Sequence, residues 1–91
     1  MENENVIDQN FQEAVRNINN LNTRPTDDEL LKLYGLYKQS LFGDNKTDKP
    51  GFFSFRGNKK WNSWMEHAGK SKQKAKKEYV SYAKEIIILL K

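Results

Sequence analysis

Apolar residues recur along this chain with the spacing of an α-helix, in stretches separated by turn-forming segments. The first stretch has apolar side chains three or four positions apart, at Phe11, Ala14, Val15, Ile18 and Leu21. This spacing predicts a helix with one apolar face over residues 8–21, capped by Asn5 or Asp8. The segment that follows breaks the helix, because the residue before Pro25 avoids helical backbone angles.

A second helix is predicted over residues 27–42, and its start carries clear local signals. Thr26 and Glu29 have the spacing of a capping box, in which each side chain bonds to the backbone of the other residue. The acids of the first turn suit the positive end of the helix dipole. Gly43 follows the helix as a natural stop.

Two stripes of side chains run along this second helix. Leu30, Leu33, Tyr34, Tyr37 and Leu41 share one face, and Leu31, Tyr34 and Lys38 lie beside it. One stripe can enter a core, and the other then offers apolar surface, a phenol and a cation in order. Gly35 interrupts the helix at a cost of about 1 kcal/mol relative to alanine. The simpler interpretation is a tolerated surface glycine, and the alternative is a close approach of the ligand or of a neighbouring helix.

The remaining chain predicts a long connection and two further helices. Residues 43–57 are rich in Gly, Pro, Asp and Asn, which is typical of a loop. We expect Phe52, Phe53 and Phe55 to pin this loop onto the core. A third helix is predicted over residues 58–67, ending at a partly exposed His67, and a fourth over residues 72–90 with Ser71 as its N-cap.

The fourth helix carries an apolar stripe like that of the first. Its members are Ala75, Tyr79, Tyr82, Ala83, Ile86, Ile87 and Leu90. Because the two stripes match in kind, we expect the first and fourth helices to pack together. With no strand pattern anywhere in the sequence, the fold class is all-α.

Composition excludes several classes of function. Ninety-one residues make one domain, so residues 1–91 are expected to form a single unit. The chain has no cysteine and one histidine, too few for a zinc site or a histidine-based catalytic set. No nucleophile–base pair is apparent, so we expect no enzyme, no catalytic residue and no bound metal. The acidic start is unlike a signal peptide, which indicates a cytoplasmic protein.

Charge is distributed unevenly. Residues 1–30 hold seven acids and two bases, and residues 31–91 hold five acids and fourteen bases. The positive part favours an anionic partner, which could be a nucleic acid, a membrane surface or a polyphosphate ligand. The tract Lys70–Lys77 has five lysines and by itself resembles a nucleic-acid or anionic-membrane patch, although a solvated helix face is the simpler interpretation. Ile88 or Leu89 near the C-terminus is expected to be exposed.

Several short motifs occur in a characteristic order. They are Tyr34-Gly35-Leu36-Tyr37-Lys38-Gln39, Gly43-Asp44, Pro50-Gly51 and Lys60-Trp61-Asn62-Ser63-Trp64. Each is weak alone, but their order and spacing resemble the acyl-CoA-binding protein family over about residues 8–90. The resemblance implies an up-down-down-up four-helix bundle, with the long connection between the second and third helices.

The resemblance also implies a function and a site. The chain would bind medium- to long-chain fatty acyl-CoA thioesters, as a monomeric intracellular carrier and pool former without catalysis or cofactor. It would touch membranes or acyl-CoA-using enzymes only transiently and would not bind nucleic acid. By position, the residues that contact the coenzyme A part are Tyr34, Tyr37, Lys38, Arg56, Lys60 and Tyr79. The acyl chain would lie in a groove lined by Leu30, Leu31 and the start of the third helix. The chain departs from the family at Asn19, where a ligand-contacting lysine is common.

Overall fold

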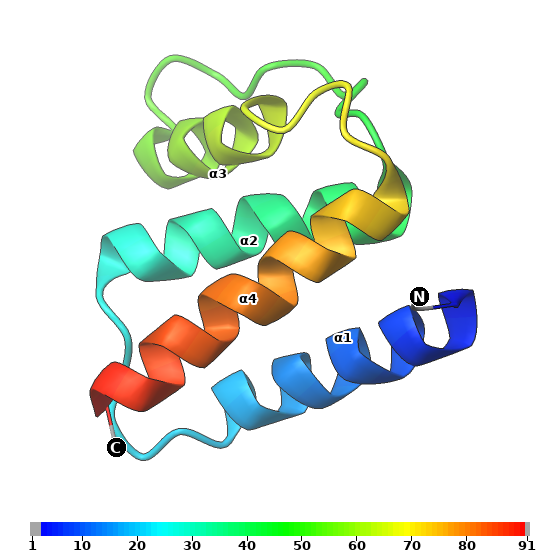
Figure 1. Ribbon diagram of the computed structural model, residues 1–91. Helices are drawn as coiled ribbons and strands as arrows, with labels where there is room; N and C mark the ends of the chain where they lie inside the picture. The colour runs from blue at the N-terminus through cyan, green and yellow to red at the C-terminus, as the bar shows by residue number, and fades with distance from the viewer. Residues whose placement is uncertain (1–2, 91) are drawn as a thin grey trace.

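Residues 3–90, which the computed structural model describes, form four helices and contain no strand. The helices are α1 (Glu4–Asn19), α2 (Asp27–Phe42), α3 (Phe55–Met65) and α4 (Lys72–Leu90). Figure 1 shows that α2 and α3 run in the same direction, opposite to α1 and α4. The expected all-α, up-down-down-up bundle is therefore confirmed. The long connection between α2 and α3 makes their parallel arrangement possible.

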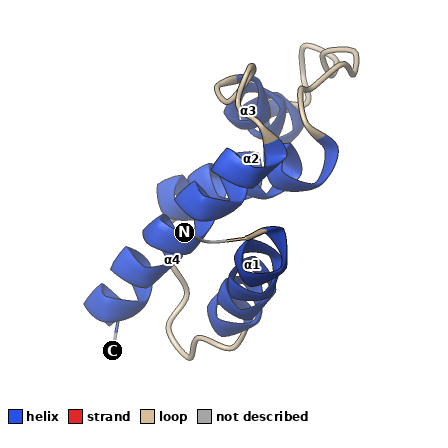
Figure 2. Ribbon diagram, turned by 45° about the vertical axis from the view of Figure 1, so that its right-hand side comes forward, coloured by secondary structure: helices blue, strands red, loops and turns tan. Residues whose placement is uncertain are grey.

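The core is formed by α1, α2 and α4. α4 packs against both α1 and α2, whereas α3 packs against α2 alone among the described helices (Figures 1 and 2). The buried cluster contains Phe11, Ala14, Ile18, Leu33, Leu36, Tyr79, Ala83 and Ile86. The Phe11 and Tyr79 rings meet edge to face, with 5.1 Å between centroids. The predicted packing of the first helix against the fourth is thus confirmed.

Burial along α2 differs from the prediction of a single core stripe. Its buried residues are Leu33, Gly35, Leu36, Gln39 and Ser40. Leu36, which lies on neither predicted stripe, is among the most buried side chains, while Tyr37 and Leu41 are exposed. The reason is that α2 packs against α4 on one side and α3 on another. Its Tyr34 side therefore remains open at the surface.

Gly35 is a point of close helix contact, so the simpler interpretation as a surface glycine was wrong and the alternative, a close approach of a neighbouring helix, is confirmed. The residue is buried, and a Cβ atom built on it would lie 2.3 Å from the backbone oxygen of Ser63 in α3. Any side chain would push α3 away from α2. Glycine at this position therefore sets the spacing between the two helices.

Helix ends follow the predictions for α2 and α4 but not for α1 and α3. In α2, the Thr26 backbone N–H donates to Glu29 Oε1 at 2.8 Å and the Glu29 N–H donates to Thr26 Oγ1 at 3.1 Å, which completes the capping box. Gly43 ends α2 with φ of 76°. Ser71 Oγ accepts from the Lys74 N–H at the start of α4.

The first and third helices begin earlier than predicted. The Asn3 side chain accepts from the Val6 N–H at 2.9 Å, so α1 starts at Glu4, and neither Asn5 nor Asp8 is its N-cap. α1 also ends at Asn19 rather than at residue 21. α3 starts at Phe55 and ends at Met65, instead of spanning residues 58–67. The Asn58 amide holds its first turn by donating to the backbone oxygens of Gly51 and Ser54.

Candidate ligand-binding site

A cavity of about 370 Å³ opens between α2 and α3. It is lined by Arg24, Asp27, Leu30, Leu31, Tyr34, Arg56, Lys59 and Lys60. α2 supplies the apolar part of the wall, and α3 supplies three bases. The structure thus places five of the residues predicted for the ligand site around one cavity: Leu30, Leu31, Tyr34, Arg56 and Lys60.

The Tyr34 ring lies near two lysines that come from different helices. Lys38 Nζ is 6.0 Å from the ring centroid, and Lys60 Nζ is 5.3 Å from it. Lys38 also lies 4.5 Å from the Phe42 ring centroid and 5.0 Å from that of Trp64. Aromatic faces attract cations through their quadrupole. The result is a phenol with two ammonium groups beside it, an arrangement that can bind phosphate and stack on a base.

Trp64 links the end of α2 to α3 at this site. It is buried, and its indole Nε1–H donates to the backbone oxygen of Gly43 at 2.8 Å. Phe42, by contrast, is exposed beside Lys38. Sequence reasoning singled out Trp64 as core or groove wall and did not single out Phe42, because a single apolar residue at a helix end carries no distinctive pattern.

Arg24 and Lys59 also line the cavity, and neither was predicted. Arg24 forms an ion pair with Asp27 at 2.8 Å, and its hydrogen bond lowers the pKa of that carboxyl group. Asp27 therefore stays ionised and is neutralised by Arg24, so Arg56, Lys59 and Lys60 leave the cavity positive. The adjacent lysines at 59 and 60 were a signal in the sequence, but Arg24 lies outside any helix and gave none.

The two remaining predicted residues, Tyr37 and Tyr79, lie on the α1 side of α2. Their ring centroids are 6.4 Å apart, and Phe11 stacks on Tyr37 with 5.9 Å between centroids. Burial, followed by the nearby Tyr37, raises the pKa of Tyr79 to about 12, so its hydroxyl stays protonated at neutral pH. A tyrosine in this state can donate a hydrogen bond.

A second hollow, of about 380 Å³, borders Tyr37. Phe11, Arg16 and Lys76 also line it. The predicted residues are thus divided between two sides of α2. Tyr34 and the other cavity residues lie on the α3 side, and Tyr37 lies on the α1 side. Asn19, where the family often has lysine, is exposed at the last position of α1.

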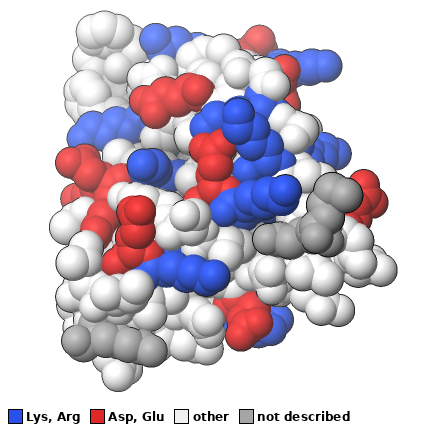
Figure 3. Space-filling view, viewed as in Figure 1, with Lys and Arg blue, Asp and Glu red and all other residues white. Residues whose placement is uncertain are grey.

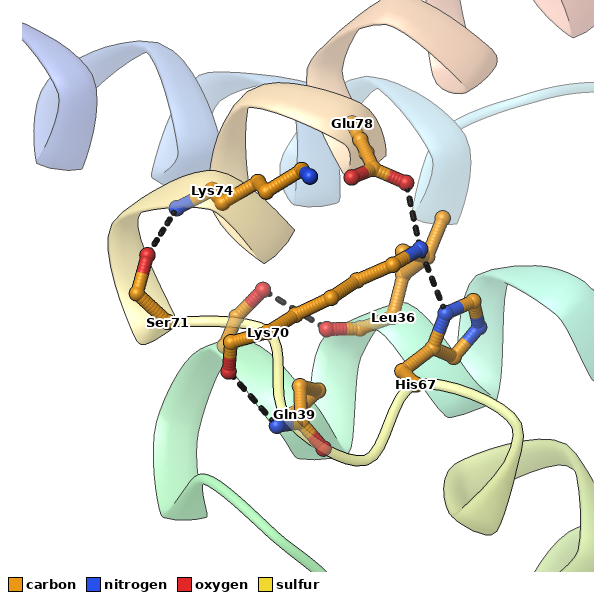
Figure 4. A network of polar contacts seen from close by, with 8 residues as sticks. Leu36, Gln39, His67, Lys70, Ser71, Lys74 and Glu78 are labelled. Atoms are coloured by element: carbon orange, nitrogen blue, oxygen red, sulfur yellow. Dashed lines mark hydrogen bonds and ion pairs between the residues drawn. The ribbon is translucent and has the colours of Figure 1, made fainter.

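A polar network fixes the start of α4 against the end of α2 (Figure 4). Lys70 Nζ donates to Glu78 Oε1 at 2.6 Å and to His67 Nδ1 at 2.9 Å. The buried amide of Gln39 donates to the Lys70 backbone oxygen at 2.8 Å and to Asp44 at 2.9 Å. These bonds join Gln39, the residue after Lys38, to the α3–α4 connection. They hold α2, which carries Tyr34 and Lys38, in place.

His67 is buried in this network, so the prediction of a partly exposed helix-end residue was wrong. An ammonium group can only donate, so Nδ1 is the acceptor and the imidazole carries its proton on Nε2. Burial first, and the Lys70 charge second, lower the pKa of His67. The ring is therefore neutral at neutral pH.

The lysine tract at residues 70–77 is not one continuous basic patch. Lys70 is engaged as above, and Lys76 Nζ pairs with Asp8 at 2.7 Å and lies 5.9 Å from the Phe11 ring centroid. Lys72, Lys74 and Lys77 are exposed. Figure 3 shows basic side chains gathered over the first half of α4, with acidic groups among them. Two of the five lysines thus have internal partners.

Residues 3–90 contain neither a metal centre nor a helix that could span a membrane. No group of three His, Asp or Glu side chains there is arranged to hold a metal ion. None of the described helices combines the length and apolar character needed to cross a bilayer.

The chain is similar to known proteins over most of its length. Residues 8–83 match the family profile "Acyl CoA binding protein". Acyl-CoA-binding protein 2 of Saccharomyces pastorianus is 45% identical over 82 residues, covering 90% of this chain and 94% of the yeast protein. Acyl-CoA-binding protein homolog 1 of Caenorhabditis elegans is 48% identical over 77 residues, covering 85% and 90%.

Solved structures give the same result. The crystal structure of Oryza sativa Acyl-CoA-Binding Protein 2 superimposes with a TM-score of 0.86 at 31% identity, covering 91% of this chain and 92% of the rice protein. The crystal structure of ACBP from Moniliophthora perniciosa gives a TM-score of 0.78 at 29% identity, covering 91% of this chain and 93% of the Moniliophthora protein. Because the family profile, the curated relatives and the solved structures all match over most of its length, this chain belongs to the acyl-CoA-binding protein family.

Proposed function

We propose that this chain binds medium- to long-chain fatty acyl-CoA thioesters and carries them between membranes and enzymes, keeping a pool of bound ligand. The observation that carries this proposal is the Tyr34 ring flanked by Lys38 and Lys60, at a cavity whose apolar wall is Leu30 and Leu31. A ligand with an anionic end and an apolar end matches this order of side chains. Relatives named as acyl-CoA-binding proteins support the same ligand.

The anionic end of the ligand is assigned to the basic and aromatic side chains. Lys38 and Lys60 bind phosphate, with Arg56 as a third cation at the cavity, and Tyr34 stacks on the adenine or donates to phosphate. Tyr37 and the protonated Tyr79 complete the contact on the α1 side. Asn19 carries no charge where the family often has lysine. Arg16, one turn earlier on α1 and beside Tyr37, supplies a cation instead.

The apolar end of the ligand lies against Leu30 and Leu31. Each buried acyl methylene contributes about 0.8 kcal/mol before costs. Immobilising the ligand and ordering its flexible chain offset much of this gain. Tight binding therefore needs both ends of the molecule, which is why the intact thioester is the proposed ligand.

Binding of this kind involves no bond-making or bond-breaking step on the chain and requires no cofactor. The thioester is shielded from water until an acyl-CoA-using enzyme receives it. We further propose that the chain acts in the cytoplasm and as a monomer.

Calorimetric titration tests the proposal with three ligands: a fatty acyl-CoA, coenzyme A alone and the free fatty acid. The expected result is strong binding of the thioester and much weaker binding of either part. Equal affinity for the free fatty acid and the thioester would show that the basic side chains form no phosphate site. Equal affinity for coenzyme A and the thioester would show that Leu30 and Leu31 do not bind the acyl chain.

A further inference from the structure

Three phenylalanines project into solvent from the segment that leads into α3, contrary to the prediction that they pin the loop onto the core. Phe52, Phe53 and Phe55 are 83%, 82% and 70% exposed. The Phe52 and Phe53 rings meet edge to face with 5.2 Å between centroids. Phe52 and Phe55 also line a shared shallow hollow with Lys49 and Lys59. These three residues are called the phenylalanine patch.

Polar contacts, rather than the phenylalanines, hold this loop. The Trp61 indole N–H donates to the Thr47 backbone oxygen at 3.1 Å. The buried Asn45 accepts from the Thr47 N–H at 2.9 Å, and Asn58 binds the backbone oxygen of Gly51. These hydrogen bonds hold the loop in place, so its conformation does not depend on burying the phenylalanine patch. Exposed apolar patches of this kind mark interaction sites.

The surroundings of the patch are basic. Between residues 45 and 62 the sequence has five bases and one acid. Figure 3 shows an uncharged corner over the start of α3 with basic side chains on its border. Figures 1 and 2 show this loop at the end of the molecule beyond α3, away from α1. No described helix obstructs an extended flat surface there.

We propose that the phenylalanine patch docks this protein onto anionic lipid bilayers, with the rings entering the interface and the neighbouring bases contacting the headgroups. Aromatic side chains favour the membrane interface, and lysines and arginines are attracted to the negative surface of anionic leaflets. A second copy of this chain would bring a patch of the same positive charge, which the bases around the rings would repel. The charge therefore selects the anionic surface.

The position of the patch ties docking to ligand loading, a part of the inference that rests on the proposed function. Lys59 lines both the hollow beside Phe52 and Phe55 and the cavity floored by Leu30 and Leu31. None of the three phenylalanines lines that cavity. Docking through the patch thus brings the cavity near the bilayer, where an acyl chain can pass from lipid to protein.

Vesicle flotation tests the docking. The full chain is mixed with vesicles of phosphatidylcholine and phosphatidylserine in equal parts, and with vesicles of phosphatidylcholine alone. The double variant Phe52→Ser/Phe53→Ser should bind the anionic vesicles roughly tenfold more weakly or worse, because two large apolar side chains are removed. The matched control Ile88→Ser/Leu89→Ser removes side chains that are 74% and 76% exposed at the other end of the chain. It should bind as the unaltered protein does.

Other outcomes overturn the proposal. Equal flotation of the phenylalanine variant and the unaltered protein, or no flotation of either, excludes the patch as an anchor. Loss of flotation in the Ile88→Ser/Leu89→Ser variant would show that the membrane contact lies at Ile88 and Leu89 instead. A concentration-dependent dimer that the phenylalanine variant loses in sedimentation velocity makes the patch a self-association surface.

A titration without lipid separates this proposal from the proposed function. Octanoyl-coenzyme A should bind the unaltered protein and the phenylalanine variant equally, because the patch lies outside the cavity. Weaker binding to the variant would make the phenylalanines part of the ligand site and overturn the docking role. If the unaltered protein floats with anionic vesicles but binds neither octanoyl-coenzyme A nor a long-chain acyl-coenzyme A, the proposed function fails and the docking stands.

Discussion

Individual side chains at the cavity act through their charge and their contact with aromatic rings. Lys60 and Lys38 reach the same tyrosine from two helices, and each has at least one ring within about 5.3 Å. Exposed lysines at the start of α4 lack such a setting. Lysines with equal formal charge are thus expected to differ greatly in their effect on binding, and this difference separates a specific phosphate site from a diffuse basic surface.

Replacing Lys60 by alanine should weaken acyl-CoA binding strongly. A charged hydrogen bond contributes about 1.5–3 kcal/mol, and about 1.4 kcal/mol corresponds to a tenfold change in affinity. A loss of roughly tenfold or more is therefore expected for Lys60→Ala, measured by calorimetry at physiological salt.

The matched control is Lys72→Ala, which removes an exposed lysine from α4. Its effect is carried by a field that salt screens within about 8 Å, so it should be much smaller and should fade as salt is added. Equal losses in the two variants would show a diffuse basic surface, and the phosphate site would have to be abandoned.

Among the helices, α2 and α3 supply most of the cavity wall, so their spacing sets the width of the cavity. This pairing depends on Gly35, because its missing side chain lets the backbone of Ser63 approach. Trp64 then ties α3 to the end of α2 through Gly43. A change in this contact should affect both stability and the site, since both walls of the cavity move together.

Gly35→Ala should lower the free energy of unfolding by about 1–3 kcal/mol, the usual cost of overpacking. Alanine gains about 1 kcal/mol of helix propensity over glycine. That gain is outweighed, because the clash at 2.3 Å is with the backbone of α3, which can yield only by moving the helix. Urea unfolding measures the change.

Gly51→Ala is the matched control for this substitution. Nothing lies within 4 Å of a Cβ atom built on Gly51, so its stability should change by no more than about 0.5 kcal/mol. If Gly35→Ala proves as stable as the unaltered protein, the close contact between the helices does not determine their spacing.

In the molecule as a whole, the connection between α3 and α4 joins three helices through polar groups that are buried or half-buried. His67, Lys70 and Glu78 meet there, and Gln39 reaches them from α2. The network is built around a neutral imidazole facing an ammonium group. Protonation of the imidazole would place two positive charges in contact, with the Glu78 carboxylate offsetting them only in part.

This arrangement makes stability depend on pH in a defined range. The pKa of His67 is lowered in the folded state from 6.5, so near and below that pH the unfolded chain binds more protons. Stability is full above about pH 6.5 and is lost as the pH falls below it. Thermal melting across this range should show a falling midpoint.

His67→Gln isolates the contribution of the imidazole, because glutamine keeps a hydrogen-bond acceptor but does not titrate. Its midpoint should change less than that of the unaltered protein between neutral pH and about pH 5.5, above the range in which ordinary carboxyl groups are protonated. Parallel curves for the two proteins would show that His67 contributes nothing to the pH dependence.

The sequence by itself determined the helices, because their signals are local. Apolar spacing and capping residues act within a few positions, which is why the bounds of α2 and the pairing of α1 with α4 were predicted correctly. The order of the motifs around Tyr34 and Trp64 was enough to indicate the family and its ligand. The starts of α1 and α3 were predicted wrongly, since Asn3 and Asn58 act through side-chain bonds that leave little trace in the pattern.

Only the tertiary structure decided which side chains are buried and which surround a common cavity. Gly35 and His67 looked like surface positions because their partners, Ser63 and Lys70 with Glu78, come from other parts of the chain. The exposure of Phe52, Phe53 and Phe55 depends on polar anchors that hold the loop without them. Hydrophobicity is a property of one residue, whereas burial depends on what the rest of the chain packs against it, and no local pattern records that.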